Sequence, residues 1–127
     1  FCIFTSSVSK KMRIIKENTA AIVIDIQERL FPHMYESEKL LQNCQKLIDG
    51  LHVLTIPIIA TQQYTKGLGP TLPSVSIRFF EFSFIEKMSF SCFDEPIVRE
   101  HLNSLNRSII ILFGIEAHVC VMQTLST

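Results

Sequence analysis

The sequence predicts an α/β protein built on a parallel sheet. Short stretches that are apolar at nearly every position, such as 20–26 and 108–113, are typical of strands buried on both faces. Segments with apolar residues at helical spacing separate these stretches, and this alternation favours parallel strands joined by right-handed crossovers. With 47% hydrophobic residues, the chain of 127 residues has enough apolar side chains for the core of one domain.

The first half of the chain predicts a strand, a helix and a second strand. Residues 20–26 form the first strand. Ser37 is placed to cap the helix, because a serine oxygen accepts a hydrogen bond from a free N–H group of the first turn. The second strand is 56–61, with Pro57 near its start, where a missing N–H is tolerated. The core face of the helix carries Leu40, Leu41, Cys44, Leu47, Ile48 and Leu51.

The second half repeats this pattern after a loop. Residues 62–76 are rich in glycine and proline, which indicates a loop, and 79–86 form the third strand. Asp94 is expected to cap the next helix, with Pro96 in its first turn. The fourth strand, 108–113, leads into a turn.

Charge and apolar content exclude several classes of partner. Twelve basic and twelve acidic residues cancel, with no run of like charge, which argues against nucleic acid and anionic membranes. The longest apolar runs are far too short to span a bilayer. We expect a soluble protein of the cytoplasm, and a mitochondrion or another organelle is also compatible with this composition.

The four cysteines are far apart in the sequence. Cys2, Cys44, Cys92 and Cys120 form no C-x-x-C pair, and no histidine cluster accompanies them. This pattern favours free thiols in a reducing compartment over a zinc site or a disulfide framework. We therefore predict no metal and no cofactor, and we expect Cys44 to belong to the core.

The domain is expected to cover residues 12–127. Residues 1–11 include serines and lysines but no arginine, and their apolar stretch is too short for a good signal peptide. Met12 is a natural start. Residues 1–11 are therefore assigned to an N-terminal extension outside the domain.

Three chemically distinctive side chains follow predicted strands. Asp25 interrupts the first strand, Lys87 follows the third, and Cys120 lies past the fourth, where a helix is expected to begin. An acid, an amine and a thiol at the carboxyl ends of parallel strands can converge on one point. The N–H groups at a helix start favour the thiolate, which is the reactive form of cysteine. Taken singly, these residues also fit a loop-capping acid, a solvated lysine and a buried thiol.

With their flanking residues, these three positions resemble the isochorismatase-like cysteine hydrolases. The resemblance runs from about residue 14 to residue 124. The loop 61–71 (TQQYTKGLGPT) is similar to the isochorismatase-domain-containing subgroup, whose substrates are poorly defined. The matching segments are 23–27 (VIDIQ), 86–93 (EKMSFSCF) and 114–124 (GIEAHVCVMQT).

The resemblance implies a Rossmann-like, three-layer α/β/α fold with strand order 3-2-1-4-5-6. The chain ends in the helix that begins at Cys120, so only strands one to four are expected to be complete and the domain is expected to be truncated. The fourth strand would then form an unpaired apolar edge of the sheet. Nicotinamidases of this superfamily carry an Asp-x-His metal motif after the second strand, where this chain has Gln62, Gln63 and Tyr64.

The resemblance also implies a mechanism. Cys120 is the nucleophile, Asp25 the general base and then acid, and Lys87 the cation that stabilises both anions. The backbone N–H groups of Glu116 and Cys120 would form the oxyanion hole, if the family's cis peptide before Glu116 is present. The expected reaction is metal-independent cleavage of an amide-type C–N bond in a small molecule through a thioester.

The remaining expectations are coarser. Phe31, Gln62 and Phe90 lie on loops near the carboxyl ends of the strands and are candidates to line a substrate pocket. Core packing explains either phenylalanine equally well. A homo-oligomer is expected from the resemblance. The alternative is a catalytically inactive binding or interaction protein of the same fold, because an unfinished sheet would hold the three residues poorly.

Overall fold

The structure is a computed structural model that describes residues 2–6, 15–89 and 91–114. One sheet of five strands, in the order β1-β5-β2-β3-β4, runs through these residues. Its strands are β1 (Cys2–Ser6), β2 (Thr19–Ile24), β3 (Ile58–Gln63), β4 (Ile85–Lys87) and β5 (Ile109–Gly114). The helices are α1 (Ser37–Val53), α2 (Thr65–Leu68), α3 (Pro73–Ser76) and α4 (Pro96–Leu105), and short 3-10 turns cover Lys16–Asn18, Phe31–His33 and Cys92–Asp94.

The parallel part of the sheet confirms the predicted fold. β2 pairs in parallel with β3 and with β5, and β3 pairs in parallel with β4. These strands are the predicted strands one to four, and their order is the expected 3-2-1-4. The carboxyl ends of β2, β3 and β4 therefore meet at one edge of the sheet.

The expectation that the fourth strand forms a free edge is wrong. β1 pairs antiparallel with β5, from Cys2 opposite Gly114 to Ser6 opposite Ile110. An apolar edge strand presents a row of unpaired N–H and C=O groups, and β1 satisfies them. Part of the segment assigned to an N-terminal extension thus contributes a strand to the sheet.

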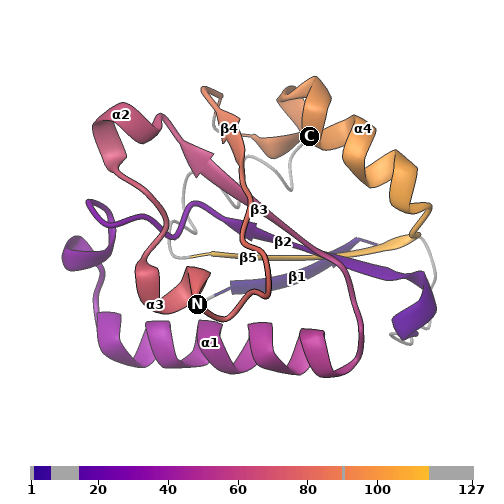
Figure 1. The fold of residues 1–127 in the computed structure, drawn as a ribbon, viewed down its shortest axis with the longest axis horizontal. Coiled ribbons are helices and arrows are strands. Elements are labelled where there is room, and N and C mark those ends of the chain that lie inside the picture. Colours follow the sequence, from indigo (N-terminus) through magenta and orange to yellow (C-terminus); the bar gives the residue numbers. More distant parts are fainter. Residues whose placement is uncertain (1, 7–14, 90, 115–127) are drawn as a thin grey trace.

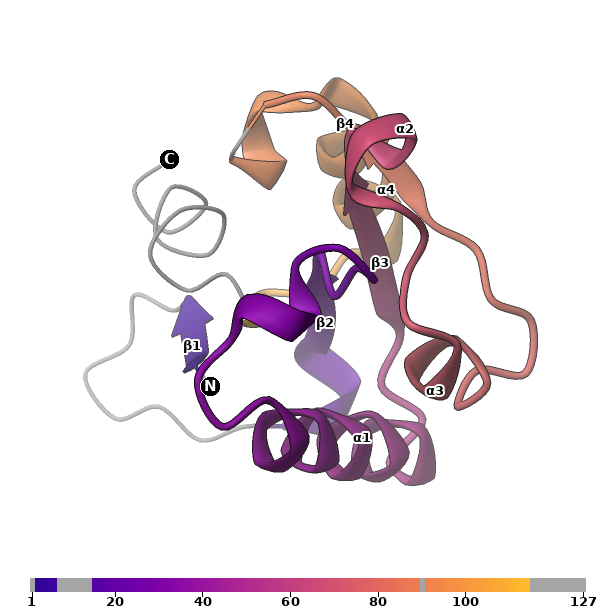
Figure 2. The same cartoon turned by 90° about the vertical axis from the view of Figure 1, so that its left-hand side faces the viewer.

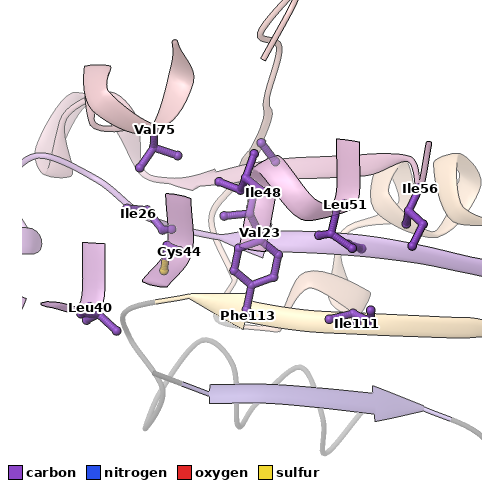
Figure 3. Close-up of a cluster of buried hydrophobic side chains, with 12 residues drawn as sticks. Val23, Ile26, Leu40, Cys44, Ile48, Leu51, Ile56, Val75, Ile111 and Phe113 are labelled. Carbon is purple, nitrogen blue, oxygen red and sulfur yellow. The ribbon is translucent and has the colours of Figure 1, made fainter. Parts of the chain in front are cut away.

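Helices cover both faces of the sheet (Figures 1 and 2). α1 and α3 lie on one face, which we call the α1 face, and α4 lies on the other, the α4 face. Side chains of β2 alternate between the two: Val23 packs with Cys44 and Ile48 of α1, whereas Ile22 packs with Val98 of α4. Figure 3 shows the α1-face cluster, in which Val23, Cys44 and Ile48 gather with Phe113 of β5. The predicted core position of Cys44 is confirmed.

Several predicted boundaries move, each for a local reason. β3 ends at Gln63 rather than at residue 61, because buried hydrogen bonds hold both glutamines at its end. The third strand shrinks to Ile85–Lys87, because the phenylalanines before it, such as Phe79, pack against the α1-face cluster instead.

The predicted caps also shift by one residue. Ser37 is the first residue of α1, and the preceding residue, Glu36, takes a left-handed conformation with φ 49°. Asp94 ends a 3-10 turn, so the capping position of α4 falls on Glu95. Pro96 lies in the first turn as predicted.

Candidate active site

Asp25 lies immediately after β2, at the point where the chain leaves the sheet. Its φ of 53° is left-handed, a conformation that aspartate tolerates better than most residues. Its backbone N–H donates to the carbonyl of Thr61 on β3 at 3.2 Å. The side chain is completely buried, so the strand places a carboxylate where water does not reach it.

The partner of this carboxylate is Lys87, the last residue of β4. Its Nζ lies 2.9 Å from Oδ2 of Asp25, and neither side chain has any exposed surface. A buried charge costs several kcal/mol unless it is paired, about 3–5 kcal/mol for one left without its partner. The two predicted site residues therefore meet, and each accounts for the burial of the other.

Within the described residues, three oxygen atoms lie close to the ammonium of Lys87. Besides Oδ2 of Asp25, Nζ donates to Oε1 of Gln63 at 2.8 Å and to the carbonyl of Ser89 at 2.9 Å. The register of the parallel strands puts Gln63 directly beside Lys87. The hydrogen bonds to Gln63 and Ser89 thus orient the ammonium, and the ion pair with Asp25 balances its charge.

The two oxygens of Asp25 have different surroundings. Oδ1 accepts a hydrogen bond from the hydroxyl of Thr61 at 2.8 Å. Oδ2 forms the ion pair with Lys87 but accepts no aligned hydrogen bond within the part of the chain that the structure describes. The two oxygens of the carboxylate therefore have different partners, the Thr61 hydroxyl for Oδ1 and the ammonium of Lys87 for Oδ2.

Another buried side chain, Gln27, forms hydrogen bonds at the same edge of the sheet. Its Nε2 donates to the carbonyls of Gln63 at 2.9 Å and Gly69 at 2.8 Å, and its Oε1 accepts from the N–H of Gln63 at 2.7 Å. The chain 69–72 is further tied to this segment by the N–H of Leu72, which donates to the carbonyl of Ile26. Gln27 therefore fixes the strand end from which Gln63 reaches Lys87.

The loop that follows Lys87 is held by Glu95, at the start of α4. Oε1 of Glu95 accepts from the N–H of Met88 at 2.9 Å, from the N–H of Ser89 at 3.2 Å and from the Ser89 hydroxyl at 2.8 Å. These bonds, the Met88 N–H first among them, together with the nearby charge of Lys87, hold the pKa of Glu95 below its ordinary value.

Two thiols are described, and both are buried. Sγ of Cys92 lies 4.0 Å from Oγ1 of Thr61, the hydroxyl that donates to Asp25. Cys44 lies on the α1 face, and desolvation raises the pKa of its thiol to about 12. A thiol with such a pKa stays protonated near neutrality and is a poor nucleophile.

The predicted nucleophile lies outside the described residues. Cys120, Glu116, the peptide bond before Glu116, and Phe90 all fall in segments that the structure does not describe. The chain enters the segment with Cys120 at Gly114, the last residue of β5, which pairs with Ile24. That segment therefore begins beside the residue that precedes Asp25.

The other two candidates to line a substrate pocket, Phe31 and Gln62, pack against the core and form hydrogen bonds, respectively. Phe31 is partly buried against the α1-face cluster. Gln62 is buried, and its Oε1 accepts from both the N–H and the hydroxyl of Thr71, while its Nε2 donates to Thr65. Neither side chain contacts Asp25 or Lys87 among the bonds found in the described ranges.

Sequence reasoning missed the residues that support the ion pair. The available signal for Thr61 and Gln63 was the run of three polar residues, 61–63, that ends an otherwise apolar strand. Gln27 follows Asp25 by two residues and likewise lies just past an apolar strand. Ser89 and Glu95 could not be found in this way, since their role depends on how a loop folds back on itself.

Two features are absent from the described residues. No helix there combines the length and apolar character needed to cross a bilayer. No group of three or more histidine, cysteine, aspartate or glutamate side chains there is arranged to bind a metal ion.

Comparison with known proteins agrees with this architecture. Isochorismatase domain-containing protein 2 of Danio rerio is 30% identical over 112 residues, which are 88% of this chain and 56% of that protein. A Caenorhabditis elegans structure described as MAR1 ribonuclease is 37% identical, with a TM-score of 0.79, over 89% of this chain and 58% of that one. The YcaC gene product of Escherichia coli, described as an octameric hydrolase of unknown specificity, shares the fold at 21% identity and a TM-score of 0.79, over 89% of this chain and 57% of that one.

The chain spans a little more than half the length of these relatives. The family model described as the isochorismatase domain matches residues 19–127, a range that includes Asp25, Lys87 and Cys120. Together with the strand order and the buried acid–amine pair at the carboxyl ends of the strands, this match shows that the chain belongs to the isochorismatase family.

Proposed function

We propose that this protein is a metal-independent cysteine hydrolase that cleaves an amide-type C–N bond in a small molecule. The observation that carries the proposal is the buried pair of Asp25 and Lys87 at the edge where the segment with Cys120 begins. A buried ion pair adds little net stability, because desolvation offsets its attraction. A catalytic role would explain why a buried ion pair is present at this edge of the sheet.

In the proposed first step, Cys120 transfers its proton to Oδ2 of Asp25. The resulting thiolate attacks the carbonyl carbon, a C–S bond forms, and the carbonyl electrons move to oxygen. Backbone N–H groups of Glu116 and Cys120 stabilise this oxyanion. Lys87 offsets the negative charge that the sulfur and then the oxyanion bring to the site.

The tetrahedral intermediate collapses with cleavage of the C–N bond. The leaving amine takes the proton held by Asp25, and an acyl-thioenzyme remains. Asp25 then deprotonates a water molecule that attacks the thioester. The C–S bond breaks, the acid leaves, and the proton returns to Cys120.

Two measurements test this proposal. In the purified protein, iodoacetamide should alkylate Cys120 rapidly near neutral pH, as followed by peptide mass spectrometry, and hydrolysis of a panel of small amides should be lost in Cys120→Ser. The two side chains are close in size, so the circular dichroism of Cys120→Ser should match wild type. A Cys120 that reacts only above its ordinary pKa of about 8.5, or full turnover in Cys120→Ser, overturns the assignment.

Hydrolysis of RNA is a second candidate, favoured by the 37% identity to the protein described as MAR1 ribonuclease. The balanced charge of the chain argues against it, because neutralising phosphates requires a basic surface. Incubation of a labelled RNA with wild type and Cys120→Ser decides between the two. Cleavage that disappears with the thiol supports the ribonuclease, whereas equal cleavage by both preparations indicates a contaminant.

The assembly, the pocket and the compartment belong to the same proposal. We infer a homo-oligomer, as the Escherichia coli relative is octameric, and a cytoplasmic protein without a cofactor. Phe31, Gln62 and Phe90 remain candidates to line the substrate pocket. If the alkylation test fails, the binding or interaction protein becomes the better description.

A further inference from the structure

We propose that Glu95 is a positioning residue for the lysine of the site, acting through the backbone of Ser89. The inference rests on the proposed function, because its readout is the reactivity of Cys120. It concerns a residue outside the acid–amine pair, on a different element, and assigns it a role in preparing the nucleophile.

The route from Glu95 to Lys87 consists of two contacts. Oε1 of Glu95 accepts three hydrogen bonds from Met88 and Ser89, at 2.9, 3.2 and 2.8 Å. The carbonyl of Ser89 in turn accepts from Nζ of Lys87 at 2.9 Å. Glu95 therefore fixes the peptide that supplies one of the oxygens around the ammonium.

Glu95 is one of two described side chains that hold this loop; the other is Gln63, whose Nε2 donates to the carbonyl of Met88 at 2.9 Å. β4 ends at Lys87, so Ser89 lies beyond the sheet and its position depends on the loop. Glu95 belongs to the start of α4, which packs on the sheet through Val98. A loop anchored to a packed helix holds its carbonyl more closely than a free loop would. Under the proposed function, the ammonium must be held to within a fraction of an ångström if it is to stabilise the thiolate of Cys120.

A positional role and a purely electrostatic role predict opposite effects on the thiol. If Glu95 acted only as a nearby anion, its removal would favour the thiolate, and Cys120 would react at lower pH. If Glu95 positions Lys87, its loss lets the ammonium move away from the site. The thiolate then loses its stabilising cation, and Cys120 reacts only at higher pH.

Two conservative substitutions of Glu95 separate the effect of side-chain length from the effect of side-chain charge. Glu95→Asp keeps the charge and remains a favourable helix cap, but it is one methylene too short to reach Met88 and Ser89. Glu95→Gln keeps the reach and an acceptor oxygen but loses the charge. Glu100→Ala, an exposed acid on the same helix, is the matched control for a change of net charge.

The test is the rate of iodoacetamide alkylation of Cys120 against pH in the purified protein, with circular dichroism to verify folding. Glu95→Asp should shift the midpoint upward and slow the reaction at pH 7 about tenfold, as a one-unit shift requires. Glu95→Gln should stay within about threefold of wild type, and Glu100→Ala should match it.

Two other results overturn the inference. A wild-type rate in folded Glu95→Asp shows that the contact does not position the lysine. A Glu95→Gln that reacts faster than wild type, beside a Glu95→Asp that reacts normally, shows that the charge of Glu95 and not its contact with the loop affects the thiol. If wild-type Cys120 itself reacts like an ordinary thiol, the proposed function fails instead, so the two failures are distinguishable.

Discussion

The ammonium of Lys87 lies 2.9 Å from Oδ2 of Asp25, with both side chains sealed from solvent. The two residues are far apart in the sequence, and the parallel sheet brings them together because β2 and β4 flank β3 and all three strands end at the same edge. The side-chain oxygen of Gln63, at the end of β3, also accepts a hydrogen bond from this ammonium. The fold therefore positions the candidate site through strand order.

The ion pair predicts strong coupling between its partners. Lys87→Met or Asp25→Asn alone should lower the free energy of unfolding by about 3–5 kcal/mol, because each leaves the other partner buried without a counter-charge. The double variant should lose much less than the sum of the two. Urea unfolding of the four proteins measures the coupling, and strictly additive losses would show that the pair is not energetically linked.

Gly114 is predicted to tolerate no side chain. A Cβ there would lie 2.4 Å from the carbonyl oxygen of Ile24, so β5 and β2 would have to separate beside Asp25. Gly114→Ala should destabilise the protein by about 1–3 kcal/mol and reduce hydrolysis.

The control is Gly50→Ala, in helix α1, where a Cβ meets nothing within 4 Å. That change should stabilise the protein by about 0.4–1 kcal/mol, because alanine is the better helix former. Thermal unfolding of both variants tests the pair of predictions. Similar melting temperatures for the two would refute the close approach of the strands.

Gln27 is predicted to stabilise the fold through its hydrogen bonds to Gln63 and Gly69. Gln27→Leu leaves the buried N–H and C=O of Gln63 and the partly buried C=O of Gly69 without this partner, at a cost of about 1–3 kcal/mol for each buried group that stays unpaired. Gln42→Leu, on the exposed side of α1, should change stability by less than about 0.5 kcal/mol. Equal denaturant midpoints for the two variants would show that the hydrogen bonds of Gln27 do not stabilise the protein.

The buried thiol of Cys44 is predicted to make the free energy of unfolding depend on pH in the alkaline range. Burial raises its pKa from 9.0 to about 12, so above pH 9 the unfolded chain releases a proton that the folded chain keeps. The contribution of this thiol is complete below about pH 9 and is lost as pH rises toward 12. Cys44→Ala should therefore show a flatter fall in unfolding free energy between these pH values, and an unchanged slope would exclude this cause.

Much of the fold follows from local sequence pattern. The continuously apolar stretches locate β2 and β5, and the spacing around Cys44 and Ile48 locates the buried face of α1. The third strand could not be delimited, because Phe79 and Phe82 have the same apolar character whether they pair in a sheet or pack as a ring contact. The pairing of β1 with β5 was missed because nothing local marks the partner of an edge strand.

The candidate site, like the fold, could be predicted from the sequence only in part. Asp25 and Lys87 could be named as candidates because charged side chains beside apolar strands are unusual. The bonds from Thr61, Gln63 and Glu95 depend on tertiary register and loop closure, which no short-range pattern encodes.

A crystal structure of the protein that locates Sγ of Cys120, with and without an aldehyde that traps thiols, would decide whether Cys120, Asp25 and Lys87 form one site. In a cysteine hydrolase of the proposed kind, this sulfur lies within about 4–6 Å of both Oδ2 of Asp25 and Nζ of Lys87, the range over which charges favour a thiolate, and the aldehyde is bound to it. A sulfur packed among apolar side chains, remote from the carboxylate and the ammonium, would contradict this arrangement.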